Sequence, residues 1–537
     1  MSVLRISRWS CATSNPWRVD YVIPKSADLL GPIDLIVDLN AAEVPTGNAA
    51  SNIGNYSAWV ESLGYAMIEE MSFMVGSHTV EKITGDQMNI INELMKGDTQ
   101  RQHKLVGKTG RSAITLDVDE TGTPVAAVAA SGTGNSAVAA VVASWPLNTY
   151  SLNDSSKERL ICAGNVPEKG KQLIIPLSFF FTKHPSQYFP LCAIAGCNDV
   201  RVSIKFRALN ELLIIGRHNY VTSTAGGSSG VGDAAVLNVA VPIQSGATTH
   251  PLPKFTKAIE AAQLRCHYVH VTGPEATTLM NKEHVRLMKL WHHQPTTFLV
   301  NHTMSATGAG NEKSFNIDLG FLHPVQELII TIRKRGNMTS STEPGGVPDF
   351  VDQGATTKNF FAYEGGGTDP NIESHLQKIK AHGTHQATSD TTSNYLQVRN
   401  FKLSLNGQER HPSLAGTGIE RGYLMDRLMP MLHSNTSETF TSASVTDAGH
   451  DASATFAHLG EMLDRKEIYV YPFALNPEGA NPSGAVNFSK VSHAKLTIDY
   501  TAFLGAATAD EEYVVDVYGV YFNWLQIKDG RALTSFQ

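Results

Sequence analysis

Three runs close the chain: IYVYPFAL (468–475), AKLTIDYTAF (494–503) and VVDVYGVYFNWLQI (514–527). A similar set stands near the middle: IPLSFFF (175–181), VRVSIKFRAL (200–209) and LRCHYVHVTG (264–273). In each set a nearly all-apolar run precedes a strictly alternating run, and an aromatic-rich run follows. An internal repeat of this length predicts two copies of one β domain.

The alternating runs have the period of a strand with one buried face. Val200, Val202, Ile204 and Phe206 point one way, and the polar residues between them point the other way. The repeat extends to earlier segments of each copy, because IEEMSFMVGSH (68–78) and QVRNFKLSLNGQ (397–408) both alternate and then reach a glycine turn signal. Most of the chain is therefore predicted to be strand.

Helices are predicted at three places. In residues 84–97, Thr84 and Gln87 form a capping-box pair, Gly97 is the predicted stop, and one stripe of the helix is expected to be buried. That stripe is Met88, Ile91 and Met95. Shorter helices are expected over Ile419 to Met429 and at the joint Glu275 to Glu283.

Length and strand number predict an all-β chain of two tandem eight-stranded jelly-roll barrels, residues 1–279 and 280–537. An N-terminal arm is expected over about residues 1–28. Long segments rich in Gly, Ser, Thr, Asn and Ala are read as loop insertions on a rigid scaffold, since long connections inside compact domains are usually exposed. They are about 118–160, 208–260, 301–314, 335–395 and 432–458.

Composition limits the partners and the compartment. The net charge of −7 gives no basic field for nucleic acid or an anionic membrane, and charged residues are only 17%. The five cysteines, an odd number in a long chain, favour buried thiols in a reducing compartment over a disulfide framework. They are Cys11, Cys162, Cys192, Cys197 and Cys266. No signal peptide is expected, and the apolar stretch 125–145 is broken at 131–136, so no transmembrane segment is expected.

Two short motifs resemble nucleotide-binding loops by letter only. Residues 132–137 (GTGNSA) fit a dinucleotide fingerprint, but no acidic residue follows at the required distance and a proline ends the next run. Gly107-Lys108-Thr109 lacks the earlier glycine of a phosphate-binding loop, because Gln102 occupies that position. Both are interpreted as ordinary loops.

Histidines raise the question of a metal site. His267 and His270 are three apart on a predicted strand, so they should lie on opposite faces. The adjacent His292 and His293, considered together with His302, have the same difficulty. Structural roles are favoured over metal binding, and no catalytic, cofactor-binding or metal-ligating residue is assigned. The sequence therefore predicts a protein that is not an enzyme and has no cofactor.

Several collinear stretches resemble the major capsid proteins of nucleocytoplasmic large DNA viruses, as in algal viruses and iridoviruses. The similar stretches span about residues 30–537. They are LGYAMIEEMSFMVGSHTVEKITGDQMNIINEL (63–94), IPLSFFFTKHPSQYFPLCAIAGCNDVRVSIKFR (175–207), HPVQELIITIR (323–333), FKLSLNGQERH (401–411), PSGAVNFSKVSHAKLTIDY (482–500) and VYGVYFNWLQIKDGRALTSF (517–536).

The resemblance implies a double jelly roll that assembles as a homotrimer, a pseudo-hexagonal capsomer that tiles a large icosahedral shell. The implied location is the virion, with synthesis in the host cytoplasm or virus factory. The implied partners are further copies of the chain, minor capsid and penton proteins and an inner membrane, with no direct binding of nucleic acid.

Two other classes of function stay open. A two-domain jelly-roll protein could bind glycans, although Trp145 is the only tryptophan in the long insertions. A metal-dependent jelly-roll enzyme is the third hypothesis.

Overall fold

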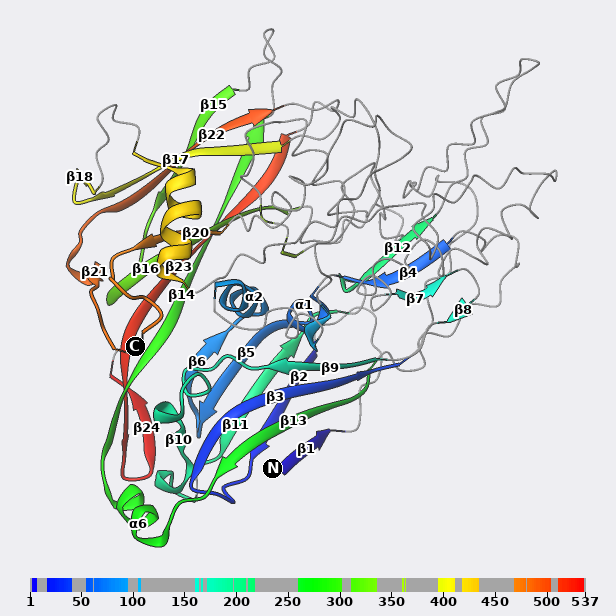
Figure 1. Ribbon diagram of the computed structural model, residues 1–537, viewed down its shortest axis with the longest axis vertical. Helices are drawn as coiled ribbons and strands as arrows, with labels where there is room; N and C mark the ends of the chain where they lie inside the picture. Colours follow the sequence, from blue (N-terminus) through cyan, green and yellow to red (C-terminus); the bar gives the residue numbers. More distant parts are fainter. Residues whose placement is uncertain are drawn as a thin grey trace, which may run out of the picture.

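A computed structural model of the chain consists mainly of antiparallel strands, as the all-β prediction requires (Figure 1). The residues that the structure describes are 2–6, 17–40, 55–60, 62–94, 105–107, 160–163, 166–167, 171–196, 198–208, 211–217, 259–301, 311–335, 360–361, 363, 395–410, 418–433, 468–479, 481–503 and 510–535.

The first sandwich has two facing sheets. One has the order β1-β13-β3-β10, with β9 also paired to β3: β1 (Ser2–Ile6), β3 (Leu29–Leu39), β9 (Lys171–Pro176), β10 (Phe189–Pro190) and β13 (Ile259–Val269). The other has the order β2-β11-β5-β6: β2 (Trp17–Ile23), β5 (Ile68–Val75), β6 (His78–Ile83) and β11 (Val200–Phe206).

The second sandwich has the same plan. One sheet has the order β14-β23-β16-β20, with β21 on β16 and β24 on β23: β14 (His284–Asn301), β16 (Pro324–Lys334), β20 (Ile468–Pro472), β21 (Val486–Asn487), β23 (Asp510–Lys528) and β24 (Arg531–Thr534). The other has the order β15-β22-β17-β18, with β19 on β17: β15 (Asn311–Asp318), β17 (Tyr395–Leu405), β18 (Gln408–Glu409), β19 (Ile419–Glu420) and β22 (Ala494–Phe503).

Strand pairing confirms the sequence repeat. The closing strands β13 and β23 pair with β3 and β16, and these two strands also pair with β9 and β20. The alternating strands β11 and β22 pair with β5 and β17 on one side. Their other neighbours are β2 and β15. The strands beyond the predicted eight in each sandwich are mostly short, such as β10, β21 and β24.

Burial explains why some runs alternate and others do not. In β11, Val200, Val202 and Ile204 are fully buried, whereas Arg201 and Lys205 are partly exposed. One face of this strand is therefore in the core, and the other carries the solvent-accessible charged side chains. In β23 the residues of both faces are buried over most of the strand: Tyr513, Val515 and Val517 enter the core of the second sandwich, and Tyr518 and Val520 enter a separate cluster on the opposite face. A continuous apolar run is the sequence signature of a strand covered on both faces.

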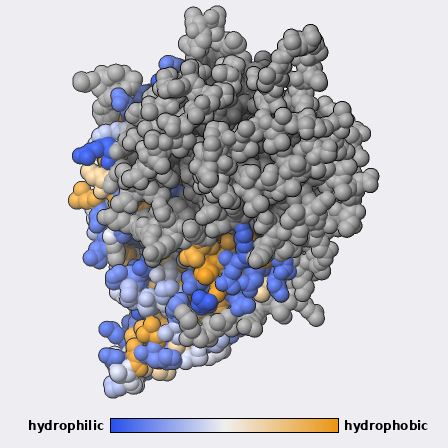
Figure 2. Space-filling view, turned by 45° about the vertical axis from the view of Figure 1, so that its right-hand side comes forward, coloured by the Kyte–Doolittle hydropathy of each residue, from blue (hydrophilic) through white to orange (hydrophobic). Residues whose placement is uncertain are grey.

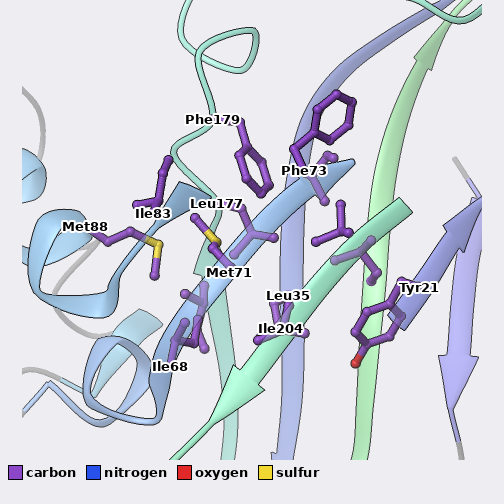
Figure 3. Close-up of a cluster of buried hydrophobic side chains, with 14 of the residues drawn as sticks. Tyr21, Leu35, Ile68, Met71, Phe73, Ile83, Met88, Leu177, Phe179 and Ile204 are labelled. Carbon is purple, nitrogen blue, oxygen red and sulfur yellow. The ribbon is translucent and has the colours of Figure 1, made fainter. Parts of the chain in front are cut away.

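The core of the first sandwich is formed by side chains from both of its sheets (Figure 3). Leu35 of β3 faces Met71 of β5 and Ile204 of β11, and all three are fully buried. Beyond them lies a group of aromatic rings, in which the centroid of Phe73 is 5.7 Å from that of Phe179 and 4.8 Å from that of Phe181. The apolar run 175–181 therefore fills the space between the sheets.

The described part of the chain includes four α-helices, of which the short α1 (Leu63–Ala66) was not predicted and the other three lie at or next to predicted positions. One of these three, α2 (Gly85–Leu94), has the expected capping box: the amide of Thr84 donates to Gln87 Oε1 at 2.9 Å, and the amide of Gln87 donates to Thr84 Oγ1 at 3.3 Å. The others are α6 (Gly273–Asn281) and α8 (Met429–Leu432), which follows a π-helical turn, η5 (Tyr423–Leu428). The predicted helix over Ile419 to Met429 was misplaced by about two residues, because Ile419 and Glu420 form β19.

Two expectations about irregular segments were wrong in part. The N-terminal arm of about residues 1–28 contains β1 and β2, which pair with β13 and β11 as regular sheet strands. The insertion of about 208–260 contains β12 (Leu213–Arg217), which pairs with β4 (Asn55–Trp59) in a side sheet completed by β7 (Leu160–Ala163) and β8 (Val166–Pro167). The rest of that insertion and most of 118–160, 335–395 and 432–458 lie outside the described residues.

The described helices include none that is long and apolar enough to cross a lipid bilayer. The stretch 125–145 lies outside the described residues.

Candidate functional site: the junction between the two sandwiches

Helix α2 lies between the two sandwiches, and all ten of its residues are buried. The single buried stripe predicted for it is thus only part of its contact surface. Met88 packs into the first core, and Ile90 and Leu94 pack against Ile329, Val470 and other residues of the second sandwich. Figure 1 shows α2 at this junction. The two copies are therefore joined through a packed apolar contact.

A buried ionic network crosses the same junction. Arg333 of β16 is 1% exposed, and its guanidinium lies between Asp86 of α2, at 3.2 Å, and Asp516 of β23, whose Oδ2 accepts from Arg333 Nε at 3.1 Å. Its Nη1 also donates to the carbonyl of Phe360 at 2.8 Å. His293 of β14 completes the network, with Nε2 at 2.7 Å from the second oxygen of Asp516. Buried charges persist in proteins only when paired in this manner.

The network controls the ionisation of Asp516. Burial by itself would raise the pKa of this carboxyl, but the charge of Arg333 and the hydrogen bond from His293 lower it below the usual range. The same two carboxylates, Asp86 and Asp516, raise the pKa of Arg333 although burial opposes this. The charged form of each side chain in the network is therefore stabilised by oppositely charged partners on β16, β23 or α2.

Part of the 335–395 insertion returns to this junction. Phe360 is 1% exposed and belongs to the first core, and the guanidinium of Arg207 lies 4.6 Å above the centre of its ring. Nearby, Asn89 of α2 donates to the hydroxyl of Tyr363 at 3.2 Å. The expectation of a surface insertion was wrong for these residues, because their aromatic side chains close the gap beside α2.

A three-stranded ribbon connects the sandwiches a second time. Strands β14 and β23 extend well beyond the second core, and β24 joins β23 at its far end (Figure 1). The inner face of the ribbon enters the first core through Met288, Leu525, Ile527 and Ala532. Its outer face exposes Val285, Trp524 and Leu533. Residues after 280 therefore contribute to the core of the first sandwich.

The histidines lie in different surroundings. His267 Nε2 lies 3.4 Å from Asp34, and His270 lies 4.0 Å from Asp28. His292 meets the ring of Phe321 edge to face, at 5.3 Å between centroids, whereas His293 belongs to the ionic network. No group of three or more metal-ligating side chains was found in the described parts of the chain. His302 lies outside them.

The remaining sequence candidates are partly described. Cys266 is a buried free thiol, as predicted, but Cys192 is only half-buried and lies in a short 3-10 turn, Leu191–Ala193, directly after β10. Gly107 has a φ of +73°, which suits the turn predicted there. Residues 108–109, the motif 132–137, Cys11 and Cys197 lie outside the described residues, as do the side-chain surroundings of Cys162.

Sequence reasoning missed the charged residues of the junction. A signal was present, because Asp516 interrupts the apolar run VVDVYGVYF and Arg333 ends the run LIITIR. A charge inside a run that is otherwise buried requires a partner. The sequence did not indicate which partner, since Asp86 and Arg333 are 247 residues apart.

Two family models match the chain. A model described as the N-terminus of major capsid protein matches residues 8–244, and one described as large eukaryotic DNA virus major capsid protein matches residues 452–532. The chain is also 22% identical over 513 residues to the major capsid protein of Phaeocystis pouchetii virus, covering 90% of this chain and 84% of the relative. These matches cover both sandwiches.

Solved structures confirm the fold. The capsid of the PBCV-1 virus gives a TM-score of 0.53 at 17% identity, covering 100% of this chain and 97% of the other. The Faustovirus major capsid protein gives a TM-score of 0.52 at 11% identity, covering 98% and 90%. The fold is the predicted double jelly roll. The chain belongs to the major capsid proteins of large eukaryotic DNA viruses.

Proposed function

We propose that this chain is the structural unit of a virus shell and assembles as a homotrimeric, pseudo-hexagonal capsomer. The observation that carries the proposal is the doubled sandwich, in which equivalent strands of the two copies have equivalent neighbours. Three such chains present six similar units around a three-fold axis, and hexagon-like tiles of this kind pack edge to edge. Closed symmetric assemblies are the usual form of homo-oligomers.

The joint between the copies supports this role. A tile needs its two sandwiches at a fixed angle, and here α2, the Arg333 network and the β14–β23–β24 ribbon all join them. We propose that the domain boundary lies in α6, after β13 closes the first sandwich and before β14 opens the second.

Exposed apolar side chains support assembly with other proteins. At the end of the molecule formed by α6 and β24, the side chains of Met280, Val285, Trp524 and Leu533 are between 43% and 59% exposed. Figure 2 shows apolar surface at that end. Gathered apolar surface in a soluble protein marks contacts with partners. Minor capsid proteins, penton proteins and an inner membrane are the further partners that this function implies.

The proposed location is the virion shell, and we propose no enzymatic activity and no cofactor. The glycan-binding alternative receives no support from the family models, the relative and the solved structures described above, which are capsid proteins.

The oligomeric state tests the proposal. Light scattering on the purified protein should give three times the chain mass of 58.2 kDa, and electron microscopy should show pseudo-hexagonal particles. Each subunit contact should bury more than about 2,000 Å², as expected for a permanent interface. A stable monomer at micromolar concentration would contradict the proposal.

A further inference from the structure

A second charged cluster lies near the junction, separate from Arg333. His433, directly after α8, is 5% exposed, and its two ring nitrogens face two carboxylates. Nε2 lies 2.8 Å from Glu327 of β16, and Nδ1 lies 3.5 Å from Glu478 in the loop after β20. Both ring nitrogens carry a proton only in the imidazolium form, so this geometry selects the charged ring.

Two lysines, one from each sandwich, interact electrostatically with the carboxylates of this triad. Lys183 lies at the exposed rim, in the first-sandwich loop between β9 and β10, and its charge acts on Glu327 and Glu478. Lys289 of β14 also acts on both carboxylates, and its Nζ donates to the carbonyl of Pro477 at 2.5 Å. The loop carrying Glu478 joins β20 to β21 and is the second-copy equivalent of the loop carrying Lys183.

Glu81 of β6 belongs to the first-sandwich side of the cluster. Its carboxylate accepts from the amide of Phe180 at 2.8 Å and interacts with Lys183. Lys183 thus interacts with all three carboxylates, whereas Lys289 and His433 interact with Glu327 and Glu478. The cluster draws on β6, β14, β16, the end of α8 and the two equivalent loops.

We propose that His433, held as an imidazolium between Glu327 and Glu478, is a proton-dependent latch that fastens α8 and the 473–479 loop to the second sandwich and loosens in mildly alkaline solution. The helical segment carries Leu424 and Met429, which pack into two of the buried clusters. His433, the residue that follows this segment, binds it to Glu327 of β16. Losing the charge on His433 removes both ionic contacts together.

The ionisation behaviour supports the geometry. Burial by itself would lower the pKa of His433. The hydrogen bonds to Glu327 and Glu478 outweigh this effect and raise the pKa to about 9. A histidine whose pKa is raised by folding stabilises fully below its unfolded pKa, about 6.5, and the contribution is lost as the pH rises through 9. The expected window is therefore about pH 6.5 to 9.

The neighbouring groups change charge in the same range. Burial raises the pKa of Glu81 to about 8, so this carboxyl gains negative charge as the pH rises. Burial also lowers the pKa of Lys289 to about 8, so a positive charge is lost. Deprotonation of Lys289 removes the free-energy cost of burying its charge. Above pH 8 this gain in stability opposes the stability that is lost when His433 deprotonates. The cluster as a whole becomes net negative.

The test compares unfolding of the full-length protein at pH 6, 7, 8 and 9 for the unmodified chain, His433→Gln and a control, His267→Gln. His267 is paired with Asp34 in the first sandwich, away from the latch. At pH 6, His433→Gln should shift the unfolding equilibrium on the order of 100-fold. This difference should nearly vanish by pH 9, while His267→Gln keeps the pH profile of the unmodified chain.

A constant difference between His433→Gln and the unmodified chain from pH 6 to 9 would assign His433 a purely packing role and overturn the proposal. If His433→Gln does not fold, Glu478→Gln keeps the Glu327 contact and should show a smaller effect in the same window. Hydrogen exchange, corrected for intrinsic rate, should rise with pH in residues 421–433 and 473–479 but not in β22. Because every contact lies within one chain, these outcomes are independent of whether the protein forms trimers.

Discussion

Asp86 and Arg333 are 247 residues apart in the chain and 3.2 Å apart in the fold. Asp86 lies in the first turn of α2 in the first sandwich, and Arg333 lies in a central strand of the second. This ion pair fixes two separate domains relative to each other at a buried point. A fixed angle between the sandwiches is what a tile built from six similar units requires.

Replacing Arg333 by methionine should destabilise the protein strongly. The substitution removes the guanidinium that lies between the buried carboxylates of Asp86 and Asp516, and breaking a buried pair in this way typically costs about 3–5 kcal/mol. Urea unfolding monitored by circular dichroism measures the loss. Arg335→Met is the matched control, because Arg335 is 51% exposed and its pair with Glu512 is worth at most about 1 kcal/mol. Equal losses for the two variants would show that the network has no special role.

Replacing Ile90 by alanine should weaken the contact between the sandwiches. Ile90 is fully buried and packs across the junction against the second sandwich. A cavity at such a site costs about 2–5 kcal/mol. Val285→Ala is the control, because Val285 is 57% exposed and its truncation should change the free energy of unfolding by less than about 0.5 kcal/mol. Calorimetry should show a lower transition temperature for Ile90→Ala, and an unchanged one would contradict the packing described.

Replacing Gly85 by alanine should be costly although alanine favours helices. A Cβ at this position would lie 2.1 Å from the carbonyl oxygen of Tyr65 and 2.4 Å from that of Ile68. Neither backbone atom can move easily, so a cost of at least about 1–3 kcal/mol is expected. Gly273 opens helix α6 with no atom within 4 Å of the same point, so Gly273→Ala should be nearly neutral. Thermal unfolding of the two variants gives the comparison, and similar midpoints would refute it.

The ionic network should also make the protein sensitive to acid. The pKa of Asp516 is lower in the folded chain than in the unfolded one, so its contribution is fully present above about pH 3.9 and is lost as the pH falls through the folded value. Asp516→Asn should therefore be less stable at neutral pH, and its stability should fall less steeply below pH 5. Denaturation curves from pH 7 to pH 3 test this. Asp499→Asn, which removes the partly exposed partner of Lys402 on another sheet, is the matched control.

The local structure was largely predictable because it depends on residues close in sequence. Val200 to Phe206 alternate, and the strand has the expected buried face. Thr84 and Gln87 cap α2 because their side chains reach only local amides. The turn at Asn406-Gly407 follows from two positive φ angles, 53° and 80°, which these residue types tolerate.

The junction could not be predicted because its partners are distant in the chain. The position of Asp516 in an apolar run indicated that it needed a counter-charge, but nothing in the sequence identified Arg333 or His293 as the neighbours. Phe360 lies in a segment whose composition is typical of a surface loop, yet its ring is in the first core. The β14–β23–β24 ribbon likewise reaches the first core only because two strands extend past their own sandwich.

The sequence by itself determined that the chain holds two copies of one β unit, since repeated apolar spacing specifies which face of each strand is buried. Only the tertiary structure decided how the copies are joined. Spacing along a strand is a local property, whereas the packing of α2 against both copies, and the charges that balance there, depend on contacts across hundreds of residues. The two copies share a plan, and only the second has its outer sheet face covered by the helix of the first.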